Sequence, residues 1–462
     1  MKPQDGQRLS DHIALGVLTR TFPPELVDEV VHETGRDQQR SRLLPARLVV
    51  YYVLAMALFS DASYEEVMRS LVEGLAWESG WKRSWRVPTK GAIFLARERL
   101  GSKPLEALFK RACVPLATPS TPGAFYRDWR LMSIDGTTLD LADTAENDEE
   151  FGRPGSGRGE GKGAFPQLRL VGLGECGTHA LTAVTMGAYR TGEQTLAAEL
   201  VASMTTGMLV LADRSFYSFG LWSAAKAQHA ELLWRTKSNH VLPVAERLED
   251  GSYLSTLHEI VNFKRRREGI PVRVVEYGVK DPGRPRAEET RYRLLTTILD
   301  PTLAPAVELA GLYAERWEFE TLLDEIKSHE RGPRVVLRSK KPDGVRQEAY
   351  GYLCLHYAIR ALMHDAASSG GLDPDRVSFT RALRAARRSV RAGVGTASNA
   401  VDHALQTAIA EITRELLPER RLRTAGRVVK RKMSNYGVKR EEHRTWPRPT
   451  MPIGQSLEIL TN

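Results

Sequence analysis

The chain has 462 residues, of which 42% are hydrophobic and 27% are charged, a balance typical of a globular protein with a large core. This composition excludes a collagen-like, a disulfide-stapled or a wholly disordered chain. The net charge is +9, with 66 Lys and Arg against 57 Asp and Glu, which favours an anionic partner.

Signals for membrane insertion and secretion are missing from the sequence. The longest apolar run, Leu48 to Phe59, is too short to span a bilayer and predicts a buried helix. The N-terminus has no apolar signal core. The three cysteines are far apart and have no metal-ligand spacing, so we expect reduced thiols and a cytoplasmic protein.

Basic residues gather in three places. They dominate residues 420–448, they form the run 264–267 (KRRR), and they recur at helical spacing between Arg381 and Arg391. A solvated face explains any one of these clusters as well as phosphate contact does. Three clusters in one chain favour a nucleic acid as the partner.

The predicted elements change character along the chain. Residues 10–115 read as helices, among them one that Thr89 begins and Gly101 ends. A linker rich in Pro, Thr and Ser follows, and short apolar strands then alternate with helices up to residue 236. This order predicts a mixed sheet with helices packed on it.

The rest of the chain divides into three parts. Residues 237–301 are β-rich and look like an insertion, residues 305–330 form a strong helix, and residues 348–417 are mostly helical. The glycine-rich loop 152–163 lacks the Gly-x4-Gly-Lys-Ser/Thr pattern, so a nucleotide P-loop is not supported.

Two aspartates stand at matching places. Asp135 and Asp213 each end an apolar predicted strand, where a rigid scaffold holds a carboxylate at the edge of a sheet. Hard divalent cations such as Mg²⁺ prefer such oxygens. Either residue taken alone is explained better by a turn-forming aspartate that merely ends a strand.

The helix 305–330 supplies a third carboxylate in an unusual setting. At about 100° per residue, four of its residues fall on one stripe, namely Tyr313, Arg316, Glu320 and Lys327. Three carboxylates can hold two Mg²⁺ ions for phosphodiester chemistry. Arginine and lysine can grip the neighbouring phosphates, and a tyrosine can bind a phosphate oxygen or stack on a base.

The spacing Tyr313-x2-Arg316-x3-Glu320-x6-Lys327 resembles the signature helix of the DDE transposases of the insertion-sequence-four family. SIDGTTLDL around Asp135 and LADRSFYS around Asp213 resemble the first and second acidic motifs of that family, and they occur in the same order. The resemblance covers roughly residues 10–440. One departure is that residues 240–300 contain no tryptophan, so the family's base-stacking tryptophan has no counterpart there.

The resemblance implies an α/β protein of mixed α+β type. Its core would be an RNase H-like mixed sheet with flanking helices and a β-rich insertion, joined to helical N-terminal and C-terminal regions. Two Mg²⁺ ions, for which Mn²⁺ can substitute, would be bound by the catalytic residues Asp135, Asp213 and Glu320. The residues implied in DNA contact are Tyr313, Arg316, Lys327 and Arg214.

The resemblance also implies a function and partners. The protein would cut double-stranded DNA at the terminal inverted repeats of its own element and transfer the freed 3′-hydroxyl ends to target DNA. It would work as a homodimer in the synaptic complex, in the cytoplasm of a bacterium and associated with the nucleoid, with no membrane partner.

Three domains follow from this interpretation. Residues 1–120 would be a helical DNA-binding domain, 121–360 the catalytic domain with its insertion at about 237–304, and 361–462 a helical, basic C-terminal region. Three alternatives remain open: a related nuclease that cuts without joining, a catalytically silent DNA-binding protein derived from a transposase, and an unrelated basic α/β protein.

Overall fold

The structure is a computed structural model in which the chain forms two compact units that interleave along the sequence. Unit 1 consists of Met1–Phe125, Asp135–Leu196 and Glu318–Pro418, and unit 2 of Tyr126–Ile134, Ala197–Trp317 and Glu419–Asn462. The residues that the structure describes are 16–37, 44–76, 87–155, 163–237, 239–261, 264–279, 291–332, 336–392, 398–418, 428–429, 437–438, 440–441 and 456–461.

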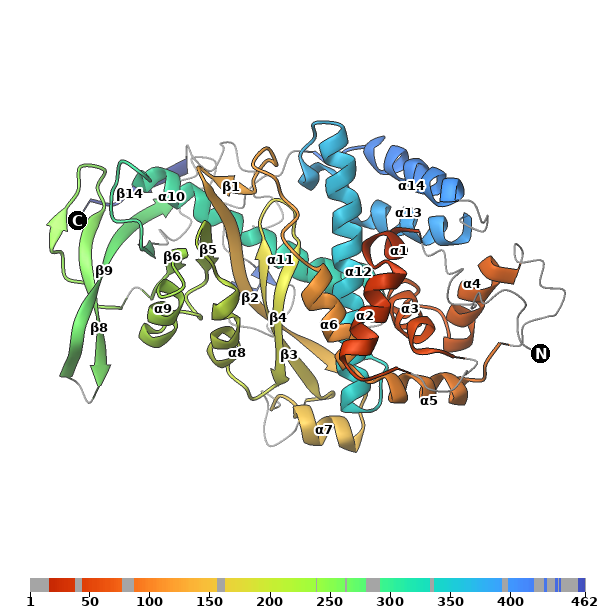
Figure 1. Cartoon of the computed structure of the whole chain (residues 1–462). Coiled ribbons are helices and arrows are strands. Elements are labelled where there is room, and N and C mark those ends of the chain that lie inside the picture. Colours follow the sequence, from red (N-terminus) through yellow and green to blue (C-terminus); the bar gives the residue numbers. More distant parts are fainter. Residues whose placement is uncertain are drawn as a thin grey trace. The chain divides into compact units, whose positions relative to one another are not determined.

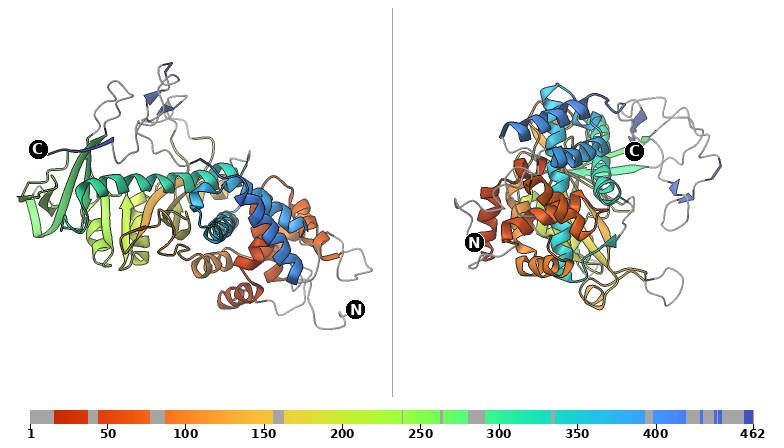
Figure 2. Two further views of the ribbon diagram at one scale, coloured as in Figure 1. Left: turned by 90° about the horizontal axis from the view of Figure 1, so that it is seen from above. Right: turned by 90° about the vertical axis from the view of Figure 1, so that its right-hand side faces the viewer.

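Unit 1 is mainly helical. Its helices are α1 (Val17–Thr21), α2 (Pro24–Glu33), α3 (Ala46–Leu58), α4 (Tyr64–Ala76), α5 (Lys90–Leu100), α6 (Lys103–Ala112), α7 (Ala145–Phe151), α12 (Pro342–Ser369), the short 3-10 helix η5 (Pro374–Arg376), α13 (Phe379–Ala392) and α14 (Ser398–Thr413). The long helix α12 runs through their middle, and α1, α3, α6, α13 and α14 pack against it (Figures 1 and 2).

The helix predicted from the longest apolar run is confirmed as α3. It is buried on every side along almost its whole length, as expected for an apolar helix in the centre of a core. The predicted ends of α5 are confirmed as well. The Thr89 hydroxyl accepts a hydrogen bond from the Ala92 backbone N–H at 3.3 Å, and Gly101 ends the helix at a φ of 70°.

The strands of unit 1 lie beside the second half of β2 (Trp129–Leu141). Next to β2 lies β3 (Gln167–Glu175), which pairs antiparallel with β4 (Leu181–Ala188). β11 (Val336–Leu337) pairs with β2 in parallel at Asp140 and Leu141. Helix α8 (Glu193–Leu200) begins in this unit.

Unit 2 contains the first half of β2 and the remaining strands of the sheet. β2 pairs in parallel with β5 (Met208–Ala212), and β5 pairs in parallel with β6 (Glu231–Arg235). The side chains of β5 and β6 are buried and apolar except at the strand ends, which is typical of parallel strands covered on both faces.

The β-rich insertion continues this part of the sheet with antiparallel strands. β10 (Tyr292–Thr296) pairs with β6, and β9 (Lys264–Val279) and β8 (Tyr253–Val261) form a long hairpin beside it (Figure 1). Further elements of unit 2 are α9 (Phe219–Lys226), β7 (Glu246–Arg247), α10 (Ala306–Leu312), the two-stranded pair β12 (Val428–Val429) and β13 (Gly437–Val438), and β14 (Leu457–Ile459). Two further short elements lie near the unit borders, β1 (Phe125–Tyr126) and the 3-10 helix η2 (Val201–Ser203).

The predicted fold class, a mixed sheet with flanking helices and a β-rich insertion, is confirmed. One strand differs from the sequence prediction: β2 does not end at Asp135 but continues to Leu141. Gly136 is followed by Thr137 and Thr138, whose β-branched side chains favour an extended chain and keep the strand going. Helix α12 runs without a break across residues 360 and 361, where the sequence suggested a domain border.

Of the three basic clusters, the structure describes the side-chain contacts of mainly one, the arginines of α13. Most of residues 420–448 and the centre of the glycine-rich loop 152–163 lie outside the described residues, as do the side chains of 264–267. The arginines of α13 are in part engaged within unit 1: Arg381 pairs with Glu415, Arg388 pairs with Glu411, and Arg387 donates to the Leu58 carbonyl at 2.7 Å. Among the described helices, none is long and apolar enough to cross a membrane.

Candidate active site

In unit 2, the second aspartate lies at the end of β5. The parallel ladder between β2 and β5 ends with the pair Ile134 and Ala212, and Asp213 is the next residue. Its carboxylate is half-buried and accepts a hydrogen bond from the Arg214 backbone N–H at 2.5 Å. The Arg214 side chain is exposed. This geometry holds the Asp213 carboxylate on a rigid strand end with one side open.

The start of the signature helix lies against the same strand end. Tyr313 and Arg316 belong to a 3-10 helix, η3 (Tyr313–Arg316), and the Tyr313 hydroxyl donates to the Ala212 carbonyl at 3.3 Å. Burial raises the pKa of Tyr313 well above its ordinary value, Arg316 lowers it, and Asp213 raises it again. The Tyr313 hydroxyl therefore keeps its proton, and its hydrogen bond to the Ala212 carbonyl fixes the start of this helix beside Asp213.

Arg316 lies between aromatic rings. Its guanidinium carbon is 5.0 Å from the centre of the Trp317 ring and 6.0 Å from that of Tyr313. Only 6% of the residue is exposed. Stacking of this kind suits the planar guanidinium and fixes the direction of its N–H groups.

In unit 1, the first aspartate lies within β2. The Asp135 carboxylate is half-buried and accepts from the Gly136 backbone N–H at 2.8 Å. Two residues further along, the Thr137 hydroxyl accepts from the Lys327 ammonium at 3.0 Å. This contact ties the far end of the signature helix to the strand that carries Asp135.

Glu193 is a further carboxylate near Asp135 that the sequence did not single out. A Cβ atom added to Gly136 would lie 3.2 Å from a Glu193 carboxylate oxygen, so the glycine lets this side chain approach the strand closely. Glu193 also pairs with Arg169 at 3.0 Å. No local sequence pattern marks Glu193, because only the tertiary fold brings α8 to Gly136.

Glu320 lies on α11 (Trp317–Asp324). Two glycines of β3 allow one side of this helix to approach the strand closely. A Cβ atom on Gly174 would lie 2.9 Å from the Phe319 ring and 3.1 Å from the Leu322 side chain, and one on Gly172 would lie 3.3 Å from Phe319. The apolar side of α11 therefore packs directly on the β3 backbone. Glu320 is half-buried.

The signature segment is not one regular helix. After α10 it tightens to the 3-10 turns of η3, returns to α-helix as α11 and widens to a π-helix, η4 (Glu325–Glu330), which carries Lys327. The stripe expected at a constant 100° per residue is therefore broken at both ends. Tyr313 and Arg316 are buried, whereas Glu320 is half-buried and Lys327 exposed. Short π-helical segments are frequent at functional sites.

The sequence analysis missed a cluster that includes Glu318, two residues before Glu320. His179, Glu318 and Asp375 offer ligand atoms that all lie within 4.8 Å of one another. The His179 Nε2 atom is 3.2 Å from an Asp375 oxygen and 3.8 Å from a Glu318 oxygen. The Gly177 backbone N–H also donates to Glu318. These residue types could hold a metal ion.

The contact of the other ring nitrogen of His179, Nδ1, indicates which nitrogen of the ring carries the proton. The Arg360 guanidinium donates to His179 Nδ1, and arginine cannot accept a hydrogen bond. Nδ1 therefore keeps its lone pair, and the proton of the ring is on Nε2, facing Asp375 and Glu318. Since a metal on Nε2 would have to displace that proton, the arrangement favours a charge network that fixes α11 over a metal centre.

The same network includes the first residue of the π-helix. Arg360 pairs with Glu325, and the His356 ring lies 3.0 Å from the Glu325 carboxylate. Burial raises the pKa of Glu325, but Arg360, His179 and His356 outweigh burial and hold that pKa well below its usual range. Glu325 is therefore charged in the folded protein at neutral pH.

Comparison with known proteins agrees with the resemblance seen in the sequence. Residues 12–110 match the family model described as insertion element 4 transposase N-terminal, and residues 128–357 match the one described as transposase DDE domain. The chain belongs to the DDE transposases of the insertion-sequence-four family. The span matched by the DDE domain contains all three predicted acids of this transposase, Asp135, Asp213 and Glu320.

Of two relatives of this DDE transposase, one matches most of its length and the other about half. Transposase InsG for insertion sequence element IS4 of Escherichia coli K12 is 28% identical over 433 residues, which is 93% of this chain and 92% of that protein. Putative transposase InsZ of the same organism is 25% identical over 218 residues, 47% of this chain and 67% of that protein. A solved structure of the piggyBac transposase synaptic complex with hairpin DNA covers 88% of this chain and 86% of its own, with 16% identity and a TM-score of 0.43.

Proposed function

We propose that this transposase cuts DNA at the terminal inverted repeats of its own insertion sequence and transfers the freed 3′-hydroxyl ends to target DNA. One observation carries the proposal: Asp135 and Asp213 each directly follow the last residue pair, Ile134 and Ala212, of two neighbouring parallel strands. Both lie in the span that matches the DDE domain, as does Glu320.

The three proposed catalytic carboxylates suit divalent metal ions. Each of these residues lies on or directly after a strand or helix and is half-buried: Asp135, Asp213 and Glu320. The regular elements fix their backbone, and half-burial leaves part of each side chain in contact with solvent. Carboxylate oxygens are the ligands that Mg²⁺ and Mn²⁺ prefer. Two such ions would activate the attacking water or hydroxyl and stabilise the leaving oxygen of the phosphodiester.

The cations around these acids are proposed to bind and orient the DNA backbone. Arg214 and Lys327 are exposed, so each can meet a phosphate at the surface. Arg316 is held between two aromatic rings and can direct its fork of N–H groups at one phosphate. Tyr313 is only 4% exposed, so it is proposed to serve DNA contact mainly by supporting Arg316 in this position.

The partners and domain roles follow from the same proposal. Double-stranded DNA is the substrate and the target, two copies of the chain act in one synaptic complex, and association with the nucleoid results from DNA binding. Residues 1–120 are proposed to recognise the element's ends, 121–360 to catalyse, with 237–304 as the insertion, and 361–462 to add basic contacts.

The test is Mg²⁺-dependent cleavage of DNA that carries the two ends of the gene's own element, followed on gels for nicked and joined products. Glu320→Gln removes one ligand charge with little change of shape and is expected to bind the ends without cutting them. Glu149→Gln is a matched control, because Glu149 is an exposed acid on α7. It is expected to cut as the wild type does.

Each other outcome selects an alternative. Cleavage without joined products would identify a nuclease that does not transpose. Binding of the ends without cleavage by either protein would identify a catalytically silent DNA-binding protein. If the wild type neither binds nor cuts these ends, or if Glu320→Gln cuts as fast as the wild type, the proposal is wrong.

A further inference from the structure

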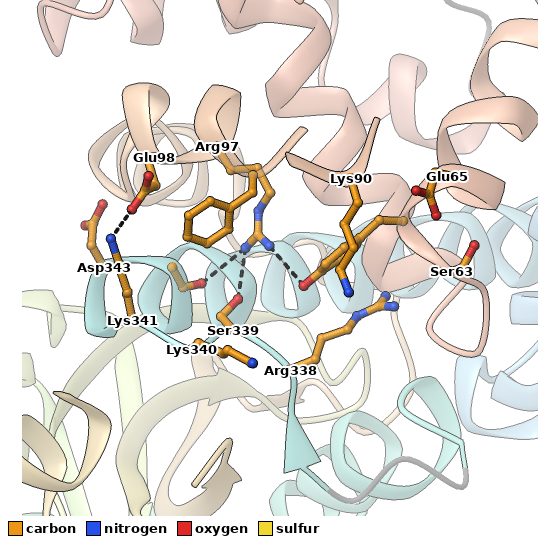
Figure 3. Close-up of a pocket in the computed structure, with 13 residues that line it drawn as sticks. Ser63, Glu65, Lys90, Arg97, Glu98, Arg338, Ser339, Lys340, Lys341 and Asp343 are labelled. Atoms are coloured by element: carbon orange, nitrogen blue, oxygen red, sulfur yellow. Dashed lines mark hydrogen bonds and ion pairs between the residues drawn. The ribbon is translucent and has the colours of Figure 1, made fainter. Parts of the chain in front are cut away.

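Unit 1 contains a cavity of about 560 Å³ that belongs to none of the groups described above. It lies between the start of α4, the helix α5 and residues 338–344, which connect β11 to α12 (Figure 3). A cavity of this size accommodates a small organic molecule. Five of the side chains that line it are basic: Lys90, Arg97, Arg338, Lys340 and Lys341.

Three of these cations surround one aromatic ring. The guanidinium carbons of Arg338 and Arg97 lie 5.0 Å and 5.9 Å from the centre of the Tyr64 ring, and the Lys90 ammonium lies 6.0 Å from it. Figure 3 shows them converging from α5 and from the segment before α12. The ring face attracts each cation, but the three positive charges repel one another.

The two arginines have neutral partners. Arg97 donates to Gln347 Oε1 at 2.7 Å and to Ser339 Oγ at 3.0 Å, and it is only 6% exposed. Arg338 donates to the backbone carbonyls of Ala62 and Met56 at 2.8 Å and 3.2 Å. Neither guanidinium has a carboxylate within ion-pair distance among the described residues, so their charge is left uncompensated.

Three acids line the cavity beside the five basic side chains: Glu65, Glu98 and Asp343. Lys341 is paired with Glu98 at 2.5 Å. The buried Glu348 accepts from the Ser339 hydroxyl at 2.6 Å and so reaches Arg97 only through that hydroxyl. Lys90 and Lys340 are exposed, and neither forms an ion pair with any residue in the described part of the chain. The cavity therefore carries an excess of positive charge and favours an anion.

An aromatic wall accompanies the cations. Phe94 lines the cavity from α5 and is 38% exposed, so its ring is open to a ligand. The Lys341 ammonium lies 5.5 Å from the centre of its ring. A flat ring beside several cations matches a ligand that has both a planar heterocycle and a phosphate.

We propose that this cavity binds a nucleoside phosphate, with the phosphate between Lys90, Arg338 and Lys340 and the base against Phe94. The ligand is either a free nucleotide or one nucleotide of a DNA strand, since the recognised chemistry is the same. The site uses none of the proposed catalytic acids, so it can be tested independently of DNA cleavage.

The test is calorimetric titration of the full chain with 5′-AMP and, separately, with inorganic phosphate. We expect 5′-AMP to bind more tightly than phosphate, and binding to weaken as salt is raised. The double variant Lys90→Gln/Lys340→Gln removes two exposed charges and is expected to raise the Kd for 5′-AMP about tenfold or more. Phe94→Ala is expected to bring 5′-AMP down to the affinity of phosphate.

A control and a competition complete the design. Lys103→Gln removes an exposed lysine of the same unit that does not line the cavity, and it should bind 5′-AMP as the wild type does. A single-stranded oligonucleotide that displaces 5′-AMP identifies the occupant as a strand, and one that does not identifies a free nucleotide. Absence of 5′-AMP binding, or equal binding by wild type and the double variant with unchanged melting temperatures, would overturn the proposal.

Discussion

Glu318 and Glu320 are the same residue type two positions apart on α11, and the structure treats them in opposite ways. The Glu318 side chain is 4% exposed and lies beside His179, with the Gly177 backbone N–H donating to it. Glu320 is half-buried. Two positions along an α-helix correspond to a rotation of about 200°, so the two carboxylates face opposite sides.

The difference shows how burial assigns a role to a charged group. A carboxylate removed from water must be paired and hydrogen-bonded, and it then fixes the elements that supply its partners. A carboxylate that keeps contact with solvent can still bind a cation or a substrate. On α11 the first kind, Glu318, positions the helix, and the second kind, Glu320, is the proposed catalytic acid.

The largest expected effect is on stability and comes from Glu318→Gln. Without this charge, the buried His179 ring and the Gly177 N–H lose their anionic partner. We therefore expect the free energy of unfolding to fall by about 3 kcal/mol. Glu320→Gln is expected to change it by less than about 0.5 kcal/mol. Urea denaturation of both variants measures the contrast, and equal losses would contradict the comparison.

A somewhat smaller effect is expected from Gly174→Ala. The added methyl group would meet Phe319 and Leu322 at 2.9 Å and 3.1 Å and would push α11 away from β3. We expect a loss of about 2 kcal/mol in unfolding free energy, the usual cost of overpacking. Cleavage of element ends should fall as well, because Glu320 moves with its helix. The matched variant Gly220→Ala, at a glycine with no atom within 4 Å of the added Cβ, should leave both unchanged.

The buried network also predicts how stability depends on pH. Burial raises the pKa of Glu325 but Arg360 outweighs it and keeps that pKa low, whereas burial lowers the pKa of His356. In both cases the unfolded chain binds protons more readily than the folded chain does. The stability that these two groups contribute is therefore complete above the ordinary histidine pKa of about 6.5 and declines below it, with a second decline below the ordinary glutamate pKa of about 4.3.

Thermal melts between pH 8 and pH 3.5 measure these two declines. In His356→Gln the first decline should be smaller, because the variant cannot take up a proton at this position. In Glu325→Gln the loss of stability relative to the wild type should be full at pH 7 and should shrink as the pH falls below about 4.3. A wild type that gains stability on acidification would contradict both assignments.

Local patterns were sufficient to predict much of this molecule. The apolar run of α3, the Thr89 cap and the Gly101 end of α5, and the mixed sheet follow from residue type and periodicity. The three proposed catalytic acids were found from short motifs and their order. Each of these features depends on residues that are close in the sequence, and such features can be read along the chain.

The features that sequence analysis missed depend on distant contacts. The partners His179, Glu318 and Asp375 come from three separate segments, and only the fold brings them together. The signature helix, which passes through 3-10, α and π turns, is anchored at both ends. Tyr313 donates to the Ala212 carbonyl at one end, and Glu325 pairs with Arg360 at the other. A constant period of 3.6 residues cannot predict such anchoring.

The smallest expected effect concerns a cation beside the half-buried acids. Arg214 is exposed and directly follows Asp213, so in Arg214→Gln we expect DNA carrying the element ends to bind about twofold to fivefold more weakly. The slope of log affinity against log salt should decrease by about one if Arg214 neutralises one phosphate. Filter binding at several salt concentrations measures both quantities. Lys226→Gln on α9 removes an equal charge from the same unit and should leave the slope unchanged. Equal changes in the two variants would mean that Arg214 acts through net charge alone, and no change in either would remove it from the DNA contact.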